Sequence, residues 1–306
     1  MNNKYSHLNL PSGSLRIAIT NKCNMNCFYC HNEGQPKTPQ KDMSFNDFVK
    51  IINVAKKFGL RGISITGGEP FMNKDLEKMV RFAIKNRLKK IDICSNGILI
   101  KQNINLLKMS KVISLAIGLD TCQKDKISKQ SDRGMPFSLI EENLFFMRDS
   151  NIKFSINTVY THSNKEETLK IIEYCVSNKF PLRVIELDTT HRIINCKQSG
   201  FFGKFIEDTV VKFSLEKAAV YPVNDVYCIH PNGQELYFYN AKCHERKCSE
   251  CARWTLRINS LGEAIPCYAR KDRYPILIED EKQAYINFLK SVYNLGISPE
   301  RKRIEW

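Results

Sequence analysis

The stretch that decides the fold is residues 15–31, which read Leu15-Arg16-Ile17-Ala18-Ile19-Thr20-Asn21-Lys22-Cys23-Asn24-Met25-Asn26-Cys27-Phe28-Tyr29-Cys30-His31. Its three cysteines have the spacing Cys-x3-Cys-x2-Cys and follow an apolar run, which predicts a strand that leads into a loop bearing three thiols. Three protein thiolates on a four-iron cluster leave one iron without a protein ligand, and chemistry can occur at that iron. The alternatives are a zinc site or three unrelated buried cysteines, but zinc usually takes four ligands in paired spacings.

A second motif, Gly67-Gly68-Glu69-Pro70, follows another apolar β-like run at residues 62–66. Together and in this order, the two motifs resemble those of the radical S-adenosylmethionine (radical SAM) enzymes. In that family S-adenosylmethionine chelates the open iron, and an electron from the reduced [4Fe-4S] cluster cleaves it to a 5′-deoxyadenosyl radical.

The resemblance implies a role for each matching residue. Cys23, Cys27 and Cys30 hold the cluster. The backbone around Tyr29 contacts adenine, and Gly67, Gly68 and Glu69 contact the methionyl amino group. Pro70 belongs to the same cofactor-binding loop. The remaining cofactor contacts, to ribose or carboxylate, are Ser95, Asn96 and Asn157.

The chain of 306 residues carries a net charge of +15, with 47 Lys and Arg against 32 Asp and Glu. This balance is typical of a solvated lysine-rich surface, or it indicates an anionic partner such as a nucleotide, a nucleic acid or an acidic peptide. The lysines are scattered, which favours a small anion over nucleic acid. The chain has 12 cysteines, no apolar signal region at its start and no apolar run of membrane-spanning length. We therefore expect metal-ligating cysteines in a reducing cytoplasm and no membrane partner.

The sequence predicts an α/β fold in which strands and helices alternate. The expected strands are residues 15–20, 62–66, 90–94, 112–119, 154–160 and 182–187, and the expected helices are 45–58, one capped by Asn73, 104–110, 136–148 and 165–176. Such alternation indicates βαβ units and a parallel sheet. Six units resemble the partial (β/α)6 TIM-like barrel of the family, in which chemistry gathers at the carboxyl ends of the strands.

Three regions are expected along the chain. Residues 1–13 form a lead-in, 14–220 the barrel, and 221–306 a small C-terminal domain for an auxiliary cluster. The periodicity after the sixth strand predicts a helix at 201–215, a hairpin at 224–239 that turns at 231–233, and a terminal helix at 281–293.

A second cysteine group defines the C-terminal region: Cys243, Cys248, Cys251 and Cys267. By spacing alone, these four residues can form a zinc site. Cys-x2-Cys-x-Arg followed by Pro-Cys also resembles the auxiliary region of the GTP 3′,8-cyclase group of molybdenum cofactor biosynthesis, where three cysteines hold a second [4Fe-4S] cluster that contacts the substrate. Cys243 as a fourth ligand would close that cluster and make it an electron relay or a structural centre.

The similarity to the cyclase group includes three arginines, Arg16, Arg183 and Arg253, which it implies bind the substrate. Guanidinium forks suit phosphate. The chain also departs from the group: Thr255 stands at the place of a second arginine, and Gly62 and Ser64 stand where the group has basic residues. These differences fit a relative that acts on another substrate at least as well as they fit GTP.

Three hypotheses follow. The first is a cyclase-like enzyme acting on a nucleotide or another small anionic metabolite, with an electron donor such as flavodoxin or ferredoxin. The second is a peptide-modifying radical SAM enzyme, against which we weigh that a barrel beginning at residue 15 leaves no room for an N-terminal peptide-docking domain. The third is a non-catalytic metal-binding or nucleic-acid-binding protein, which has no use for the Gly67-Gly68-Glu69-Pro70 loop. No general base stands out.

The resemblance implies two four-iron clusters, which iron and sulfide analysis with electron paramagnetic resonance can count. Anaerobically reconstituted wild type should hold about eight irons, and a Cys248→Ala/Cys251→Ala/Cys267→Ala variant about four. About four irons in both proteins, with zinc lost from the variant, would make the C-terminal site a zinc site instead.

Overall fold

Six strand–helix units form the centre of the fold. The structure is a computed structural model, and it describes residues 9–10, 12–27, 29–30, 41–122, 137–187, 201–220, 226–240, 255–266 and 272–294. The strands are β1 (Ser14–Ala18), β2 (Gly62–Thr66), β3 (Lys90–Ser95), β4 (Ile113–Gly118), β5 (Phe154–Tyr160) and β6 (Leu182–Glu186). The helices are α1 (Phe45–Lys56), α2 (Leu76–Lys85), α3 (Ile104–Leu107), α4 (Phe137–Asp149), α5 (Lys165–Asn178) and α6 (Phe201–Lys212).

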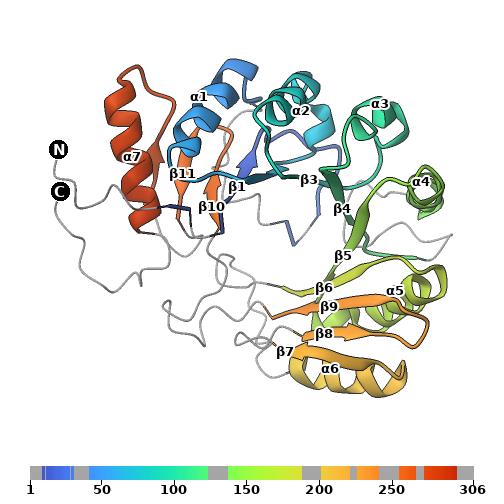
Figure 1. The fold of residues 1–306 in the computed structure, drawn as a ribbon. Coiled ribbons are helices and arrows are strands. Elements are labelled where there is room, and N and C mark those ends of the chain that lie inside the picture. The colour runs from blue at the N-terminus through green and yellow to red at the C-terminus, as the bar shows by residue number, and fades with distance from the viewer. Residues whose placement is uncertain are drawn as a thin grey trace.

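All six central strands are parallel and lie in sequence order. The sheet does not close, because different strands stand at its two edges, and Figure 1 shows it as an open arc with helices along its outer side. The prediction of an α/β fold built as a partial barrel is confirmed.

Two further groups of strands extend this sheet at its two ends. Beyond β6 lie β9 (Glu235–Tyr239), β8 (Val226–Ile229) and β7 (Glu216–Val220), and beyond β1 lie β10 (Leu256–Ile258), β11 (Glu263–Ile265) and β12 (Tyr274–Pro275). The hairpin predicted at 224–239 is confirmed as β8 and β9. The sequence gives no signal for β7, whose residues are nearly all exposed and do not alternate. The C-terminal strands thus join the sheet of the barrel, and the division into 14–220 and 221–306 stays a prediction.

The terminal helix α7 (Glu281–Tyr293) has the bounds that the sequence predicts. It packs against the first unit, since Phe288 and Tyr285 place their rings 4.9 Å and 5.1 Å from the ring of Phe58. None of the helices in the described part of the chain has both the length and the apolar character needed to cross a membrane.

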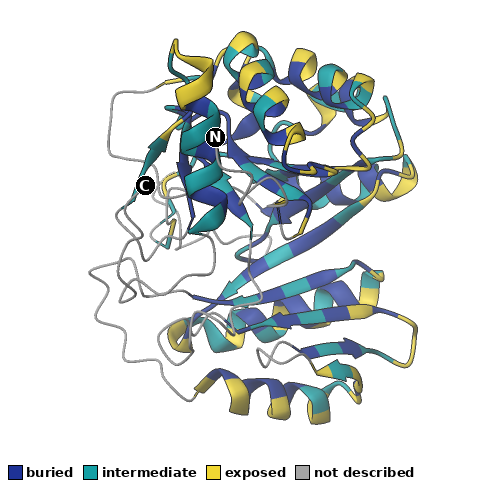
Figure 2. Cartoon of the chain, turned by 60° about the vertical axis from the view of Figure 1, so that its left-hand side comes forward, coloured by how far each residue is buried: buried dark blue, intermediate teal, exposed yellow. Residues whose placement is uncertain are grey.

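The two faces of the sheet differ in polarity. Alternate residues such as Ile17, Ile65 and Ile93 are fully buried against the helices, and Figure 2 shows this buried layer in dark blue. Central parallel strands are usually apolar on both faces. Here the other face carries half-buried polar residues, among them Arg16, Ser64, Asp92, Cys94, Ser114, Asn157, Arg183 and Arg257. We call it the polar face, and it leaves one side of the sheet for a polar ligand.

Side chains cap the starts of two helices. Ser44 caps α1, because its Oγ accepts a hydrogen bond from the Asp47 amide. Asn73 ends the 3₁₀ turn Pro70–Met72, and by position Asp75 is the N-cap of α2, without a capping bond from its own side chain. The capping bond comes from Asn73 as predicted, because its Oδ1 accepts from the Asp75 amide over 2.9 Å. Its Nδ2 also bonds the backbone at both ends of the cysteine loop, the segment between β1 and α1 that carries Cys23, Cys27 and Cys30.

Candidate active site

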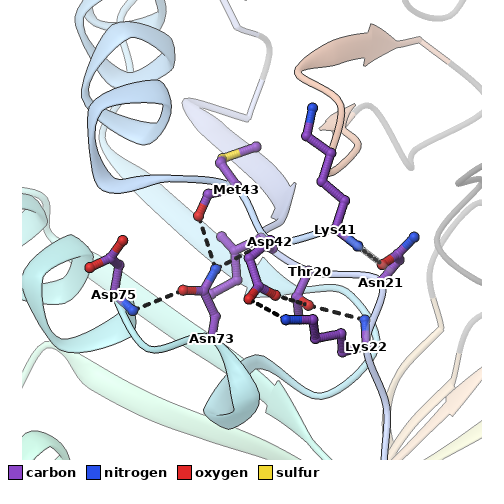
Figure 3. Close-up of polar contacts among 9 residues, drawn as sticks. Thr20, Asn21, Lys22, Lys41, Asp42, Met43, Asn73 and Asp75 are labelled. Carbon is purple, nitrogen blue, oxygen red and sulfur yellow. Dashed lines mark hydrogen bonds and ion pairs between the residues drawn. The ribbon is translucent and has the colours of Figure 1, made fainter. Parts of the chain in front are cut away.

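The cysteine loop leaves the sheet after β1 and returns before α1, and polar bonds tie its two ends together (Figure 3). Thr20 forms an isolated antiparallel bridge with Asp42, and its Oγ1 donates to Asp42 Oδ1 over 2.6 Å. Lys22 Nζ lies 2.7 Å from Asp42 Oδ2. Asn21 Oδ1 accepts from the Lys41 amide over 2.6 Å. These bonds fix where the loop begins and ends.

Asn73 adds a bond from the following loop. Its Nδ2 donates to the carbonyl of Ile19 over 2.8 Å and to that of Met43 over 3.1 Å. Figure 3 shows the bond to Met43. The side chain is buried, so these bonds satisfy carbonyls that water does not reach. Sequence reasoning missed this role because Asn73 stands where a helix cap is also expected.

The three cysteines of the loop lie near one another. Cys23 and Cys27 are half-buried and Cys30 is exposed. Burial, the Asp120 carboxylate and the two neighbouring thiols raise the pKa of Cys27 to about 12. Among the described residues, no three His, Cys, Asp or Glu side chains converge closely enough to hold a metal ion. The donor set itself fits an iron–sulfur cluster, since thiolates are its usual ligands.

Gly67 and Gly68 allow the Gly67-Gly68-Glu69-Pro70 loop to lie directly against the backbone of the cysteine loop. The Gly68 amide donates to the Thr20 carbonyl over 2.8 Å, and the Glu69 amide donates to the Lys22 carbonyl over 2.7 Å. A Cβ on Gly68 would lie 1.9 Å from the Lys22 oxygen, and one on Gly67 would lie 2.1 Å from the Thr20 oxygen. Gly67 also has a φ of +142°. Only glycine permits this contact, so the pair sets the position of the Gly-Gly loop against the cysteine loop.

Glu69 links the ends of three strands. Its carboxylate is fully buried and accepts from Ser95 Oγ over 2.9 Å and from the Asn96 amide over 2.8 Å. Asn96 Nδ2 in turn donates to Asn24 Oδ1 in the cysteine loop over 2.7 Å. Burial raises the pKa of Glu69 to about 7, against the lowering effect of its hydrogen bonds. The structure therefore brings together predicted cofactor residues and bonds them to one another. Pro70 is buried and opens the next turn.

Asp120, which follows β4, bonds Tyr29 of the cysteine loop. The Tyr29 hydroxyl lies 2.6 Å from both carboxylate oxygens of Asp120. Burial raises the pKa of Asp120 to about 6 and that of Tyr29 well above its ordinary value. The hydroxyl also bonds the Cys27 thiol. A phenol and a carboxyl group thus tie the cysteine loop to the end of β4.

Arginines approach this region on the polar face. Arg16 lies 3.4 Å from Ser64 Oγ, 3.3 Å from Thr66 Oγ1 and 3.6 Å from Cys94 Sγ. Arg257, which the sequence left without a role, lies in register with Arg16 because β10 pairs with β1 in parallel. The two strands are far apart in the sequence, so no local sequence pattern predicts that they pair.

Arg183 lies across the sheet on β6, in register with Asn157 on β5. The Asn157 Oδ1 atom is buried and has no hydrogen-bond partner. A buried polar atom in this state can bond a ligand on the polar face, and the role of Asn157 as a cofactor contact stays a prediction. Arg253 and the second cysteine group, Cys243, Cys248, Cys251 and Cys267, lie outside the described residues, so the auxiliary site stays a prediction.

Comparison with protein families and relatives agrees with this geometry. The sequence model of the radical SAM superfamily matches residues 17–175. A probable GTP 3′,8-cyclase of Methanococcus vannielii is 27% identical over 293 residues, covering 92% of this chain and 94% of that protein. Another from Saccharolobus solfataricus is 25% identical over 284 residues, covering 92% of this chain and 90% of that protein.

Solved structures share the fold at lower identity. SuiB of Streptococcus suis, bound to its precursor peptide SuiA, aligns with a TM-score of 0.66 and 17% identity over 91% of this chain. The alignment spans 65% of the SuiB chain, so this chain matches less than two thirds of that protein. The enzyme anSMEcpe with bound AdoMet aligns with a TM-score of 0.65 and 16% identity, covering 92% of this chain and 77% of that chain.

The close approach of Gly68 predicts a large effect of one methyl group. Gly68→Ala should lower the free energy of unfolding by about 1–3 kcal/mol and reduce the iron taken up on reconstitution, because the Cβ overlaps a backbone oxygen that cannot move freely. Denaturant unfolding and iron analysis measure both effects. Gly203→Ala on α6 is the control, since its Cβ would meet nothing within 4 Å. Equal behaviour of the two variants would contradict this role of Gly68.

Burial of Glu69 predicts that the metal-free protein loses stability as pH rises. The carboxyl group has a pKa of about 7 when folded against 4.5 ordinarily, so between these values the folded state binds more protons than the unfolded state. The free energy of unfolding should fall by up to about 3 kcal/mol from this group as pH rises through that window. Asp120 acts in the same direction.

Chemical denaturation at several pH values measures this slope. Glu69→Gln should flatten it, even though its absolute stability is lower because the amide replaces an acceptor of the Asn96 bond. Glu235→Gln, at an exposed position on β9, should keep the wild-type slope. An unchanged slope in Glu69→Gln would exclude Glu69 as its source.

Proposed function

The chain belongs to the radical SAM superfamily, and from this premise we propose that it abstracts a hydrogen atom from a nucleotide or another small anionic metabolite. The reaction would be a cyclase-like rearrangement or an oxidation. When bound, the cluster and S-adenosylmethionine supply the 5′-deoxyadenosyl radical for that abstraction.

The residues at the carboxyl edge of the sheet have separate parts in this proposal. Cys23, Cys27 and Cys30 would hold the cluster. The bonds of Asp42 and Asn73 fix the ends of their loop, and Asp120 orients Tyr29. These contacts position the site and restrict its motion, which is the contribution a protein makes to cofactor chemistry.

The other cofactor contacts surround this loop. Gly67 and Gly68 bring a second backbone segment to it, and the buried Glu69 carboxylate holds Ser95 and Asn96 beside it. The buried oxygen of Asn157 can accept a bond from a cofactor donor.

The pairing of Arg16 with Arg257 is the main observation in support of an anionic substrate. Like charges directly opposite each other on neighbouring strands destabilise a sheet, and a bound anion offsets this repulsion. Both side chains are half-buried on the polar face, where a guanidinium–phosphate interaction is stronger than in open water. Arg183 adds a third guanidinium on the same face. Arg253 belongs to this set as a prediction.

The relatives support a nucleotide as the anion. Proteins named probable GTP 3′,8-cyclase match this chain over most of its length and of theirs. At the position where the cyclase group carries a basic residue, however, Ser64 stands here and bonds Arg16. GTP is therefore one candidate among nucleotides. The similarity to SuiB and anSMEcpe, at 17% and 16% identity, shows the fold alone and gives no support to a peptide substrate.

Further parts of the proposal rest on the sequence. Cys248, Cys251 and Cys267, with Cys243 as a possible fourth ligand, would hold the auxiliary [4Fe-4S] cluster. A flavodoxin or ferredoxin would supply electrons, and the reducing cytoplasm suits so many thiols.

The test is formation of 5′-deoxyadenosine by the reconstituted enzyme with each of the common nucleoside triphosphates. At least one should raise its formation above the level without substrate. Arg16→Gln and Arg257→Gln should each lower kcat/KM with that nucleotide about 10- to 100-fold, because each removes a charged hydrogen bond.

Arg81→Gln is the matched control for charge, since Arg81 lies exposed on α2 and pairs with Glu77. It should leave kcat/KM unchanged. The proposal fails if no nucleotide raises 5′-deoxyadenosine formation, or if the Arg16 and Arg257 variants behave as this control does.

A further inference from the structure

Three tyrosines form an aromatic surface on the polar face, where β8 and β9 extend the sheet beyond β6 (Figure 1). They are Tyr227 on β8 and Tyr237 and Tyr239 on β9, and we call them the tyrosine wall. The ring centroids of Tyr237 and Tyr239 lie 4.5 Å apart, and those of Tyr227 and Tyr237 lie 5.9 Å apart. These short distances make the wall continuous. All three side chains are half-buried, so part of the surface of the wall is exposed.

The strand register places this wall beside Arg183. Tyr237 pairs with Arg183 across β9 and β6, Arg183 pairs with Asn157, and Tyr227 pairs with Tyr237. Paired residues on adjacent strands are about 4.8 Å apart, so these four side chains form one row across four strands. The row presents an amide, a guanidinium group and two phenol rings in that order.

The core does not account for the wall. The residues that alternate with the tyrosines, Leu236, Phe238 and Cys228, are fully buried on the opposite face and already pack against the helices. The tyrosines lie instead on the face that carries Arg16 and Arg257. Cross-strand aromatic pairs also stabilise a hairpin, and an experiment must separate that contribution from ligand binding.

We propose that the tyrosine wall binds the base of a nucleotide substrate by stacking, while Arg183 binds its phosphate. This inference rests on the proposed function and specifies how the same site recognises its ligand. Aromatic side chains bind bases through their ring faces, and a guanidinium fork binds phosphate oxygens. The two parts act on different portions of the ligand, so they can be separated by probes that carry only one of them.

The experiment compares nucleoside triphosphates with inorganic triphosphate, using calorimetry on the reconstituted full-length protein. Wild type should bind at least one nucleoside triphosphate more tightly than inorganic triphosphate. Tyr237→Leu should weaken the binding of that nucleotide about 5- to 100-fold, the range for loss of one base–aromatic stack. It should leave the binding of inorganic triphosphate unchanged. Arg183→Gln should weaken the binding of both the nucleotide and inorganic triphosphate.

Two further variants separate stacking from folding. Tyr237→Phe keeps the ring and should bind as wild type does, and Tyr293→Leu on α7 removes a tyrosine beside the other end of the sheet and should also bind as wild type. Equal nucleotide binding by Tyr237→Leu and wild type would overturn the inference and leave the proposed function standing. If Tyr237→Leu binds the nucleotide and inorganic triphosphate with equally reduced affinity, the inference is also overturned, because the wall is then only structural.

The wild-type comparison tests the idea even if Tyr237→Leu does not fold. If wild type binds inorganic triphosphate as tightly as every nucleotide, the base makes no contact and the inference is wrong. If wild type binds neither probe, the proposed anion site itself fails. If it binds an aromatic peptide but no nucleotide, the wall serves a peptide and both proposals are replaced.

Discussion

The contact between two backbone segments, residues 67–69 and 20–22, is the constraint on which the rest of the site depends. Two amide–carbonyl bonds join them, and no side chain fits between them. The contact fixes the distance between the loop after β1 and the loop after β2. Glu69 then extends the connection to the end of β3, and Asp120 with Tyr29 extends it to the end of β4. Four strand ends therefore hold one set of loops, although the sheet itself is open.

Two buried carboxyl groups hold neighbouring segments of the site together, although burial raises the free-energy cost of ionising them. Glu69 and Asp120 both lie in surroundings that oppose ionisation, and each bonds donors from a neighbouring segment. Buried polar networks of this kind specify one geometry when they are fully bonded. A site that must bring a cofactor and a substrate hydrogen together needs such a fixed geometry more than it needs stability.

Much of the fold could be predicted from the sequence, because the strands of the barrel alternate with helices and the first two strands lead into recognisable motifs. The bounds of β2 and β5 agree with the prediction at both ends. Local patterns could not reveal contacts that depend on long-range pairing, such as Arg257 beside Arg16 or the tyrosine wall beside Arg183. The second role of Asn73 could not be predicted, because its oxygen caps a helix start as expected while its amide nitrogen bonds carbonyls that only the folded chain brings near.

The pairing of β10 with β1 has a consequence for how the chain reaches this state. Leu15 pairs with Leu256, so the outer edge of the first strand has no partner until most of the protein has been synthesised. Exposed edges of this kind invite pairing with other chains, and contacts between distant segments slow folding. On the ribosome the N-terminal units can assemble while this edge stays open for a long interval. Chaperone dependence during synthesis, and poor yield at high expression rates, are expected because the edge of β1 gains its partner β10 late in synthesis.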